Sequence, residues 1–405
     1  MNRPLFQAAF LLAMMGQAVP GLAQADNKDE VIQKLLERVD ALEREVQALQ
    51  QGQKPVVAPA EPPAAVSASD SDTANASDNA SRFTFHGYAD TAFLRDENGR
   101  LDDKRFAEGE LDLFASERLS PRLTALVEVV LESDNQTLVA DVPVNVERLL
   151  LEVQGNQYFN LDIGSYRTAI GFYSTAFLRG SWLQTALSRP LLFTFEDQGG
   201  FLPLHNVGLS ANGEIPSGWL GLHYVAEVGS SRNVGQNISA PFDPADNGAM
   251  NGAIYARPAA LPGFQAGISE YRDRFSLLLG QWVRRSVQTA YAVYQAHGIE
   301  FLNEVALAKF RQSADAYGRI PAGYSQIGYR MFPSWTPYLR FEYANANGRN
   351  VNELPRTFVP WRTVELGGVR YDVNDFTAIK FEIGHETSWQ QPSWIRAAAQ
   401  VAFTF

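Results

Sequence analysis

Three absences in the sequence each exclude a class of protein. There is no cysteine, which suits a chain exported to an oxidising compartment and excludes a lipoprotein acylation site. Beyond the N-terminal segment no apolar run approaches about 18 residues, which excludes a helical membrane protein. Positive charge is in deficit, since the formal net charge is −11. Nucleic acid is therefore not expected as a partner, because phosphate binding needs clustered lysine and arginine.

Signals for catalysis and for metal binding are also missing. The five histidines are scattered, with neither metal-ligand spacing nor a His-Glu-x-x-His motif. The segment Gly208–Asn212 (GLSAN) breaks the Gly-x-Ser-x-Gly pattern of a nucleophile turn. We therefore expect no enzyme, no metal and no cofactor, and keep a hydrolase as a minor alternative.

The N-terminus has the pattern of a secretory signal peptide over residues 1–25. Arg3 supplies the positive start, an apolar segment runs from Leu5 to Val19, and Ala23-Gln-Ala25 fits a cleavage site. A membrane anchor is the alternative. The apolar core is short for that role, because a spanning helix needs about 20 apolar residues.

Two further segments precede the main body of the chain. Residues 28–51 carry apolar residues in steps of three and four with charged flanking positions, which predicts a coiled coil; a lone amphipathic helix is the alternative. Residues 52–81 are rich in Pro, Ala, Ser and Asp and have no aromatic residue, so we expect a disordered linker. The apolar positions of the coil are Ile32, Leu35, Val39, Leu42, Val46 and Leu49.

Residues 82–405 are dominated by alternation of apolar and polar side chains. For example, Leu339, Phe341 and Tyr343 alternate with Arg340 and Glu342, which is typical of a half-apolar strand. A small soluble barrel would have an apolar, packed interior. Charges of both signs in the middle of many strands favour instead an apolar outer face around a wet interior. We predict an all-β fold, a transmembrane antiparallel β-barrel of the outer membrane.

The segmentation predicts about sixteen strands, with fourteen to eighteen compatible with the pattern and 274–283 as a segment that could hold another. The expected strands are 83–95, 104–118, 121–132, 145–154, 157–165, 206–214, 218–229, 250–257, 263–272, 284–296, 299–310, 318–330, 335–344, 363–373, 375–386 and 394–405. Short turns alternate with long polar connections, as in barrels with short periplasmic turns and longer external loops. Sixteen strands leave room for an aqueous channel.

The longest connection, roughly Ser165 to His205, is rich in large apolar residues. Such residues are not left in water, and compact long loops are often functional. We predict that this loop folds into the lumen and narrows it, where opposing charges across a small gap sort solutes. Packing outside the barrel against a neighbouring subunit is the alternative. The constriction candidates are Arg167, Arg179, Arg189, Glu196 and Asp197.

Charged residues at inward strand positions are expected to line the lumen wall. Arginines matter most for anions, because the guanidinium fork suits carboxylate and phosphate. Any one of these charges could equally be solvated and paired with a neighbour. The wall candidates are Arg148, Glu152, Arg340, Glu342, Arg370, Lys380 and Glu382.

Four features together resemble the phosphate-selective porin superfamily, including trimeric porins with an N-terminal periplasmic coiled coil. They are the heptads of 32–49, the strand opening Phe83–Tyr88, the aromatic-rich loop after the fifth strand, and the C-terminal Val401–Phe405. The alternation that ends in Phe403 and Phe405 is the general insertion signal of outer-membrane barrels.

The resemblance implies a porin for passive diffusion of small hydrophilic solutes, located in the cell outer membrane with its coiled coil in the periplasm. Its implied partners are outer-membrane lipid, the barrel assembly machinery and two further copies in a trimer. Phosphate-selective members have a lysine-rich lumen, whereas only Lys104, Lys309 and Lys380 follow residue 82. A preference for small organic anions, bound by arginines, fits this composition better. The second hypothesis is a structural tether anchored by a plugged barrel.

Overall fold

The computed structural model describes residues 83–96, 105–132, 144–177, 179–195, 200–231, 248–276, 282–312, 316–349, 361–389 and 391–405. The predicted signal peptide, coiled coil and linker lie outside the described residues. Within the described part, the long elements are β-strands, and helices of a length and apolarity suited to membrane crossing are absent.

Seventeen strand segments form sixteen barrel strands, because β13 and β14 both pair with β12 and are one strand interrupted at Ala346. The segments are β1 (Phe83–Asp96), β2 (Arg105–Ser120), β3 (Leu123–Glu132), β4 (Val144–Asn156), β5 (Phe159–Arg167), β6 (His205–Ile215), β7 (Leu222–Ser231), β8 (Gly248–Ala256), β9 (Phe264–Ser276), β10 (Trp282–Ala296), β11 (Ile299–Arg311), β12 (Tyr317–Tyr329), β13 (Trp335–Asn345), β14 (Asn347–Arg349), β15 (Trp361–Asn374), β16 (Thr377–Ser388) and β17 (Gln391–Thr404). The predicted strand count is confirmed. Of the segment 274–283 considered for an additional strand, residues 274–276 belong to β9 and 282–283 to β10, and the residues between them lie outside the described part of the chain.

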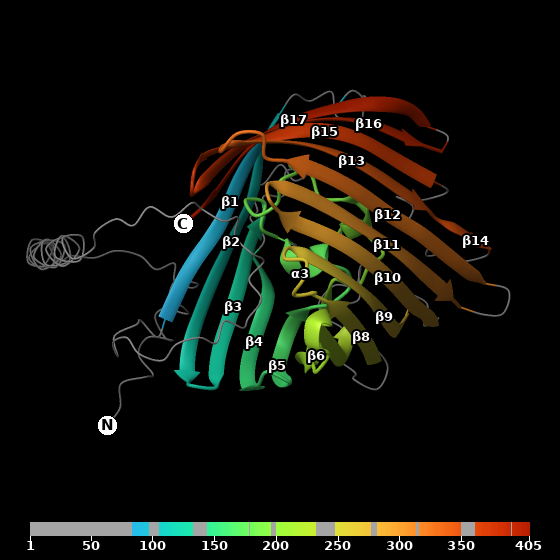
Figure 1. The fold of residues 1–405 in the computed structure, drawn as a ribbon. Helices are drawn as coiled ribbons and strands as arrows, with labels where there is room; N and C mark the ends of the chain where they lie inside the picture. Colours follow the sequence, from blue (N-terminus) through green and yellow to red (C-terminus); the bar gives the residue numbers. More distant parts are fainter. Residues whose placement is uncertain are drawn as a thin grey trace, which may run out of the picture. The chain divides into compact units, whose positions relative to one another are not determined.

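Each strand pairs antiparallel with its neighbours in sequence, and the ring closes where β1 meets β17 (Figure 1). Beyond the last paired residue, the Phe405 amide donates to the Gly87 carbonyl at 3.1 Å, and the Gly87 amide donates back at 3.0 Å. Closure removes every unpaired strand edge, as a barrel in lipid requires. The terminal residue therefore takes part in barrel closure.

Closure at this point depends on a glycine. A Cβ added at Gly87 would lie 2.6 Å from the Phe405 ring and 2.9 Å from the Asp112 carbonyl oxygen, whereas Gly252 on β8 has open space around it. We expect Gly87→Val to destabilise the barrel by roughly 1–3 kcal/mol through overpacking, and Gly252→Val to be neutral. The temperature at which the folded band is lost on unheated gels measures this. Equal temperatures for the two variants would contradict the closure role.

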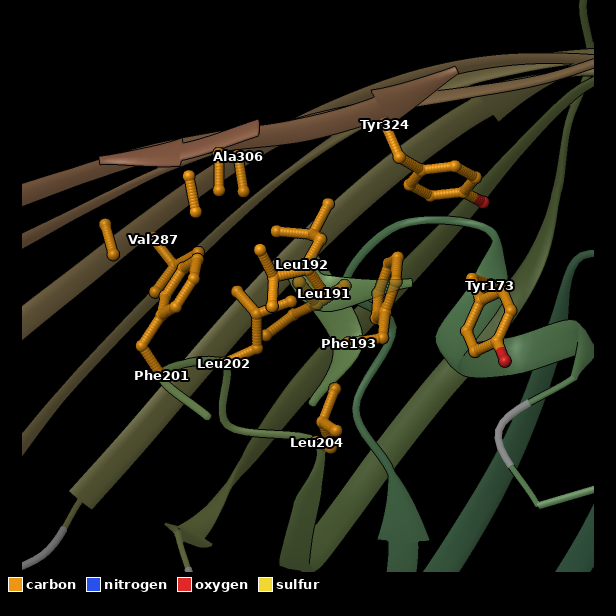
Figure 2. Packing of buried hydrophobic residues seen from close by; sticks show 14 of the residues in the cluster. Tyr173, Leu191, Leu192, Phe193, Phe201, Leu202, Leu204, Val287, Ala306 and Tyr324 are labelled. Carbon is orange, nitrogen blue, oxygen red and sulfur yellow. The ribbon is translucent and has the colours of Figure 1, made fainter. Parts of the chain in front are cut away.

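The two faces of the wall differ as the alternation predicts. Leu339 and Ile383 are 65% and 60% exposed on the outside, while Arg340 and Lys380 beside them are buried within. Phe403 and Phe405 also face outward. The expectation of a wet interior is wrong for one region, however. Along β10, β11 and β12 most of the inward residues are apolar and buried, because the long loop covers this part of the inner face (Figure 2).

One predicted strand start is wrong, and one strand contains a bulge that the sequence pattern did not indicate. The strand expected at 218–229 begins only at Leu222, because Gly218–Leu220 form a 3-10 turn and Gly221 adopts a left-handed φ of 53°. In β4 the pairing moves from Arg148 opposite Glu128 to Val146 opposite Val129, so Glu147 is an extra, bulged residue. A bulge turns two successive side chains the same way, and both Glu147 and Arg148 engage groups inside the barrel.

Candidate pore constriction

The connection between β5 and β6 lies inside the barrel, as predicted (Figure 1). Its described residues form a short helix, α3 (Tyr173–Ala176), and a 3-10 turn, η2 (Leu191–Phe193). We call its described residues, 168–177, 179–195 and 200–204, the inner loop. The surrounding strands hold it in three ways: by apolar packing, by strand side chains that bond its backbone, and by a buried cluster of ion pairs.

Apolar packing fixes the inner loop against β10, β11 and β12. Figure 2 shows the loop residues Leu191, Leu192 and Phe193 packed in the cluster that also includes Val287 of the barrel wall. Phe193 stacks on Tyr173 with ring centroids 4.9 Å apart. Each large side chain buried in this way contributes about 1.5–3 kcal/mol to the free energy of unfolding. This half of the loop therefore forms a hydrophobic core with the wall.

A single buried carboxylate holds the start of the helix. Glu304 on β11 accepts the Phe172 amide at 2.6 Å and the Tyr173 amide at 2.9 Å, and also the Tyr324 hydroxyl at 2.6 Å. Gly171 makes this approach feasible. Its φ is +76°, and a Cβ there would lie 2.3 Å from a Glu304 carboxylate oxygen.

Other strand carboxylates accept amides along the inner loop. Glu227 accepts the Ala169 amide at 3.2 Å, and Glu382 accepts the Ser188 amide at 3.2 Å. Glu342 accepts the amide of Leu191. Two of the three carboxylates, Glu342 and Glu382, are among the predicted wall residues, and here they bind the loop backbone.

The cationic wall residues bind carbonyl oxygens of the same loop. Arg340 donates to the Ser188 carbonyl at 2.8 Å, and Arg370 donates to the Trp182 carbonyl at 2.6 Å. Lys380 donates to the carbonyl oxygens of Ala186, at 3.2 Å, and Ser181. These cations and the strand carboxylates therefore replace the hydrogen bonds that water would give an exposed loop.

Arg179 lies at the centre of a buried charge cluster. Its guanidinium donates to Glu110 at 3.0 Å and Glu147 at 2.6 Å, and also to Glu132. These carboxylates come from β2, β4 and β3 respectively. Burial alone would lower the pKa of Arg179, but the three carboxylates hold it above its ordinary value. Arg179 thus ties the inner loop to the wall opposite the apolar packing.

Arg189 joins this cluster through an aromatic ring. The guanidinium carbons of Arg189 and Arg179 lie 3.3 Å and 3.8 Å from the centroid of Phe195, a cation–π arrangement. His205, at the start of β6, pairs with Glu147 at 2.7 Å. We call Arg179, Arg189, Glu110, Glu132 and Glu147 the inner charge cluster.

The remaining predicted residues divide into three groups. Arg167 and Arg148 both pair with Glu128, a buried carboxylate apart from the inner charge cluster. Glu152 is half-buried on β4 opposite Asp162. Glu196 and Asp197 lie outside the described residues. The structure therefore brings together two of the five constriction candidates, Arg179 and Arg189.

Sequence reasoning missed several groups that hold the loop. Glu110, Glu227 and Glu304 sit at ordinary inward positions of their strands, and Glu147 is displaced by the bulge. Charge at an inward position was the available signal, but it does not distinguish a loop partner from a solvated charge. Within the described residues, no group of His, Asp and Glu has the arrangement needed to hold a metal ion.

The fold is similar to solved outer-membrane channels. An anion-selective porin from Comamonas acidovorans superposes with a TM-score of 0.55 at 12% identity, covering 80% of this chain and 99% of that one. The outer membrane channel DcaP of Acinetobacter baumannii gives 0.55 at 8% identity, covering 80% and 97%. OmpT, an outer-membrane protein of Vibrio cholerae, gives 0.52 at 14%, covering 80% and 97%. No family model and no curated protein sequence matches.

Proposed function

We propose that this protein is an outer-membrane porin that lets small hydrophilic solutes diffuse through a lumen narrowed by the inner loop. The observation that carries the proposal is a closed sixteen-stranded barrel whose interior holds a loop fastened by charged side chains. Exposed apolar side chains cover the outside of the wall, which suits lipid. The similarity to solved porins supports the same role.

Solute selection is proposed to depend on charges that are not fully buried. Arg396, Arg148 and Arg362 keep 34%, 23% and 23% of their side chains exposed. In the inner charge cluster, Glu110 and Glu132 keep 27% and 20%. A path lined by both signs creates a transverse field. The arginines would bind the carboxylates of small organic anions through their planar forks, and the scarcity of lysine departs from the lysine-rich lumen of phosphate-selective members.

The remaining parts of the proposal concern assembly. We propose a trimer held by the barrel sides and by a periplasmic coiled coil at 28–51, with a signal peptide at 1–25 and a linker at 52–81. The barrel assembly machinery would insert the chain through the terminal strand that ends in Phe403 and Phe405. Crosslinking of the full mature chain measures the oligomeric state.

The channel role is tested in planar bilayers. We expect stepwise conductances for the wild type, and altered reversal potentials in a salt gradient when Arg167, Arg179 and Arg189 are replaced by glutamine in turn. Arg118→Gln, an exposed arginine near a short turn, is the matched control. Repeated insertions without conductance would refute the channel proposal and favour a structural tether. Conductance with three unchanged reversal potentials would refute the constriction.

A further inference from the structure

The outer face of the barrel carries a concentrated patch of positive charge on β9, β10, β11 and β12. We call it the outer cation array. Its members alternate along the strands with buried, inward residues such as Tyr271, Arg285 and Phe310, so they point away from the lumen. The array consists of Arg272, Arg274, Arg284, Lys309, Arg311 and Arg319.

Strand register places these cations directly beside one another. Arg284 lies opposite Arg274 on one side and opposite Arg311 on the other. One step further along, Lys309 lies opposite Arg319. Neighbouring strands are about 4.8 Å apart, and like charges directly opposite each other destabilise a sheet. The arrangement works against folding unless an anion offsets it.

The described residues offset only part of this positive charge. Glu270 pairs with Arg272 at 2.6 Å, and both side chains are largely exposed. For Arg284, Arg311 and Arg319, the described residues show no carboxylate within ion-pair distance. The side chains of the array, together with neighbours such as Met250, enclose an open groove of about 1100 Å³.

Position on the barrel indicates what occupies the groove. The array lies where β9 and β11 end and β10 and β12 begin, at the same end as the 168–204 connection. In outer-membrane barrels the long connections face outward from the cell. Further toward the middle of β9 and β11, beyond Glu270 on β9, the outward residues Ile268 and Val305 are 63% and 57% exposed. The cations and an apolar surface therefore lie on the same face of the same strands.

We propose that the outer cation array binds the phosphate groups of an outer-leaflet glycolipid whose acyl chains lie along the apolar strands below. A free anion would use the cations alone, whereas a phosphorylated lipid matches both surfaces. Several phosphates on one headgroup can neutralise Arg284 and Arg311, which lie opposite each other, together with Arg319. The proposal rests on the membrane placement of the barrel and is independent of conduction through it.

Lipid A, with its two phosphates, is the probe, and native mass spectrometry of the folded protein in detergent counts the bound molecules. The combined Arg274→Gln, Arg284→Gln and Arg311→Gln variant should bind about 100-fold more weakly, since each basic residue near an anionic lipid surface contributes roughly fivefold. The control replaces Arg118, Arg122 and Arg330 near the short turns, with the same change of charge. It should bind like the wild type.

Two further measurements use the wild-type protein alone. Dephosphorylated lipid with the same acyl chains should bind the wild type far more weakly than lipid A, and inorganic phosphate should compete poorly. Equal binding by the array variant and the control overturns the proposal, as does equal binding of the dephosphorylated lipid. Phosphate that competes as well as lipid A also overturns it, by assigning a free-anion site. A barrel that binds lipid A as expected but never conducts refutes the channel alone.

Discussion

Replacing Arg179 by methionine is expected to make the channel strongly cation-selective. The substitution keeps most of the side-chain volume but leaves Glu110, Glu132 and Glu147 without their shared cation. At an effective dielectric constant of about 20, one charge about 10 Å from the path changes the energy of an ion by roughly 1.7 kcal/mol. We therefore expect the cation-to-anion permeability ratio to rise about tenfold or more, measured as a reversal potential.

The same change should also loosen the loop. Removing one partner of a buried ion pair costs about 3–5 kcal/mol, because the other charge stays desolvated. A double replacement of Glu110 and Glu132 by glutamine in the Arg179→Met background should restore most of the selectivity, since it removes two uncompensated charges. Arg118→Met serves as control. A reversal potential that stays at the wild-type value in Arg179→Met would place the inner charge cluster away from the ion path.

Replacing Glu304 by alanine is expected to release the inner loop from the opposite wall. The change removes the acceptor of two loop amides and of the Tyr324 hydroxyl, all buried. Each buried donor left without a partner costs about 1–3 kcal/mol, so the anchor loses roughly 3 kcal/mol or more. We expect a lower unfolding temperature, and larger, noisier single-channel currents as the loop moves within the lumen.

Glu300→Ala is the matched control for this prediction, because Glu300 lies on the same strand and accepts a hydrogen bond from the Thr185 hydroxyl of the inner loop, at 3.0 Å, rather than from loop amides. Its effect on current noise should be much smaller. Equal noise and equal unfolding temperatures in the two variants would show that backbone anchoring by Glu304 does not hold the loop.

The strands could be predicted from the chain because their signal is local. Alternation with a period of two follows from the geometry of an extended backbone, so Leu339 to Tyr343 or Ile379 to Ile383 shows its outward face without knowledge of any partner. All but one of the predicted strand ends lie within four residues of those observed; the strand predicted to end at 344 continues through β14 to Arg349. Among the other ends, the larger errors are at the start of β7, where a 3-10 turn precedes Leu222, and at the end of β9, which continues to Ser276.

Local sequence patterns could not predict the contacts of the inner loop. Its apolar content indicated that it would be buried, but its ion-pair partners lie far away in sequence. Arg179 pairs with Glu110 across 69 residues, and Phe172 bonds Glu304 across 132. Arg340 and Lys380 were correctly placed inside the barrel by their alternation. That each would bind a loop carbonyl depends on where the loop lies.

The sequence by itself determined the barrel, its approximate strand ends, the outward apolar belt and the inward loop, because each follows from residue type and spacing along a single segment. Only the tertiary structure decided which inward charges hold the loop, which part of the inner wall is covered by apolar packing, and that cations of four strands meet on the outer face. These depend on strand register and barrel closure, which bring together residues that no local pattern relates.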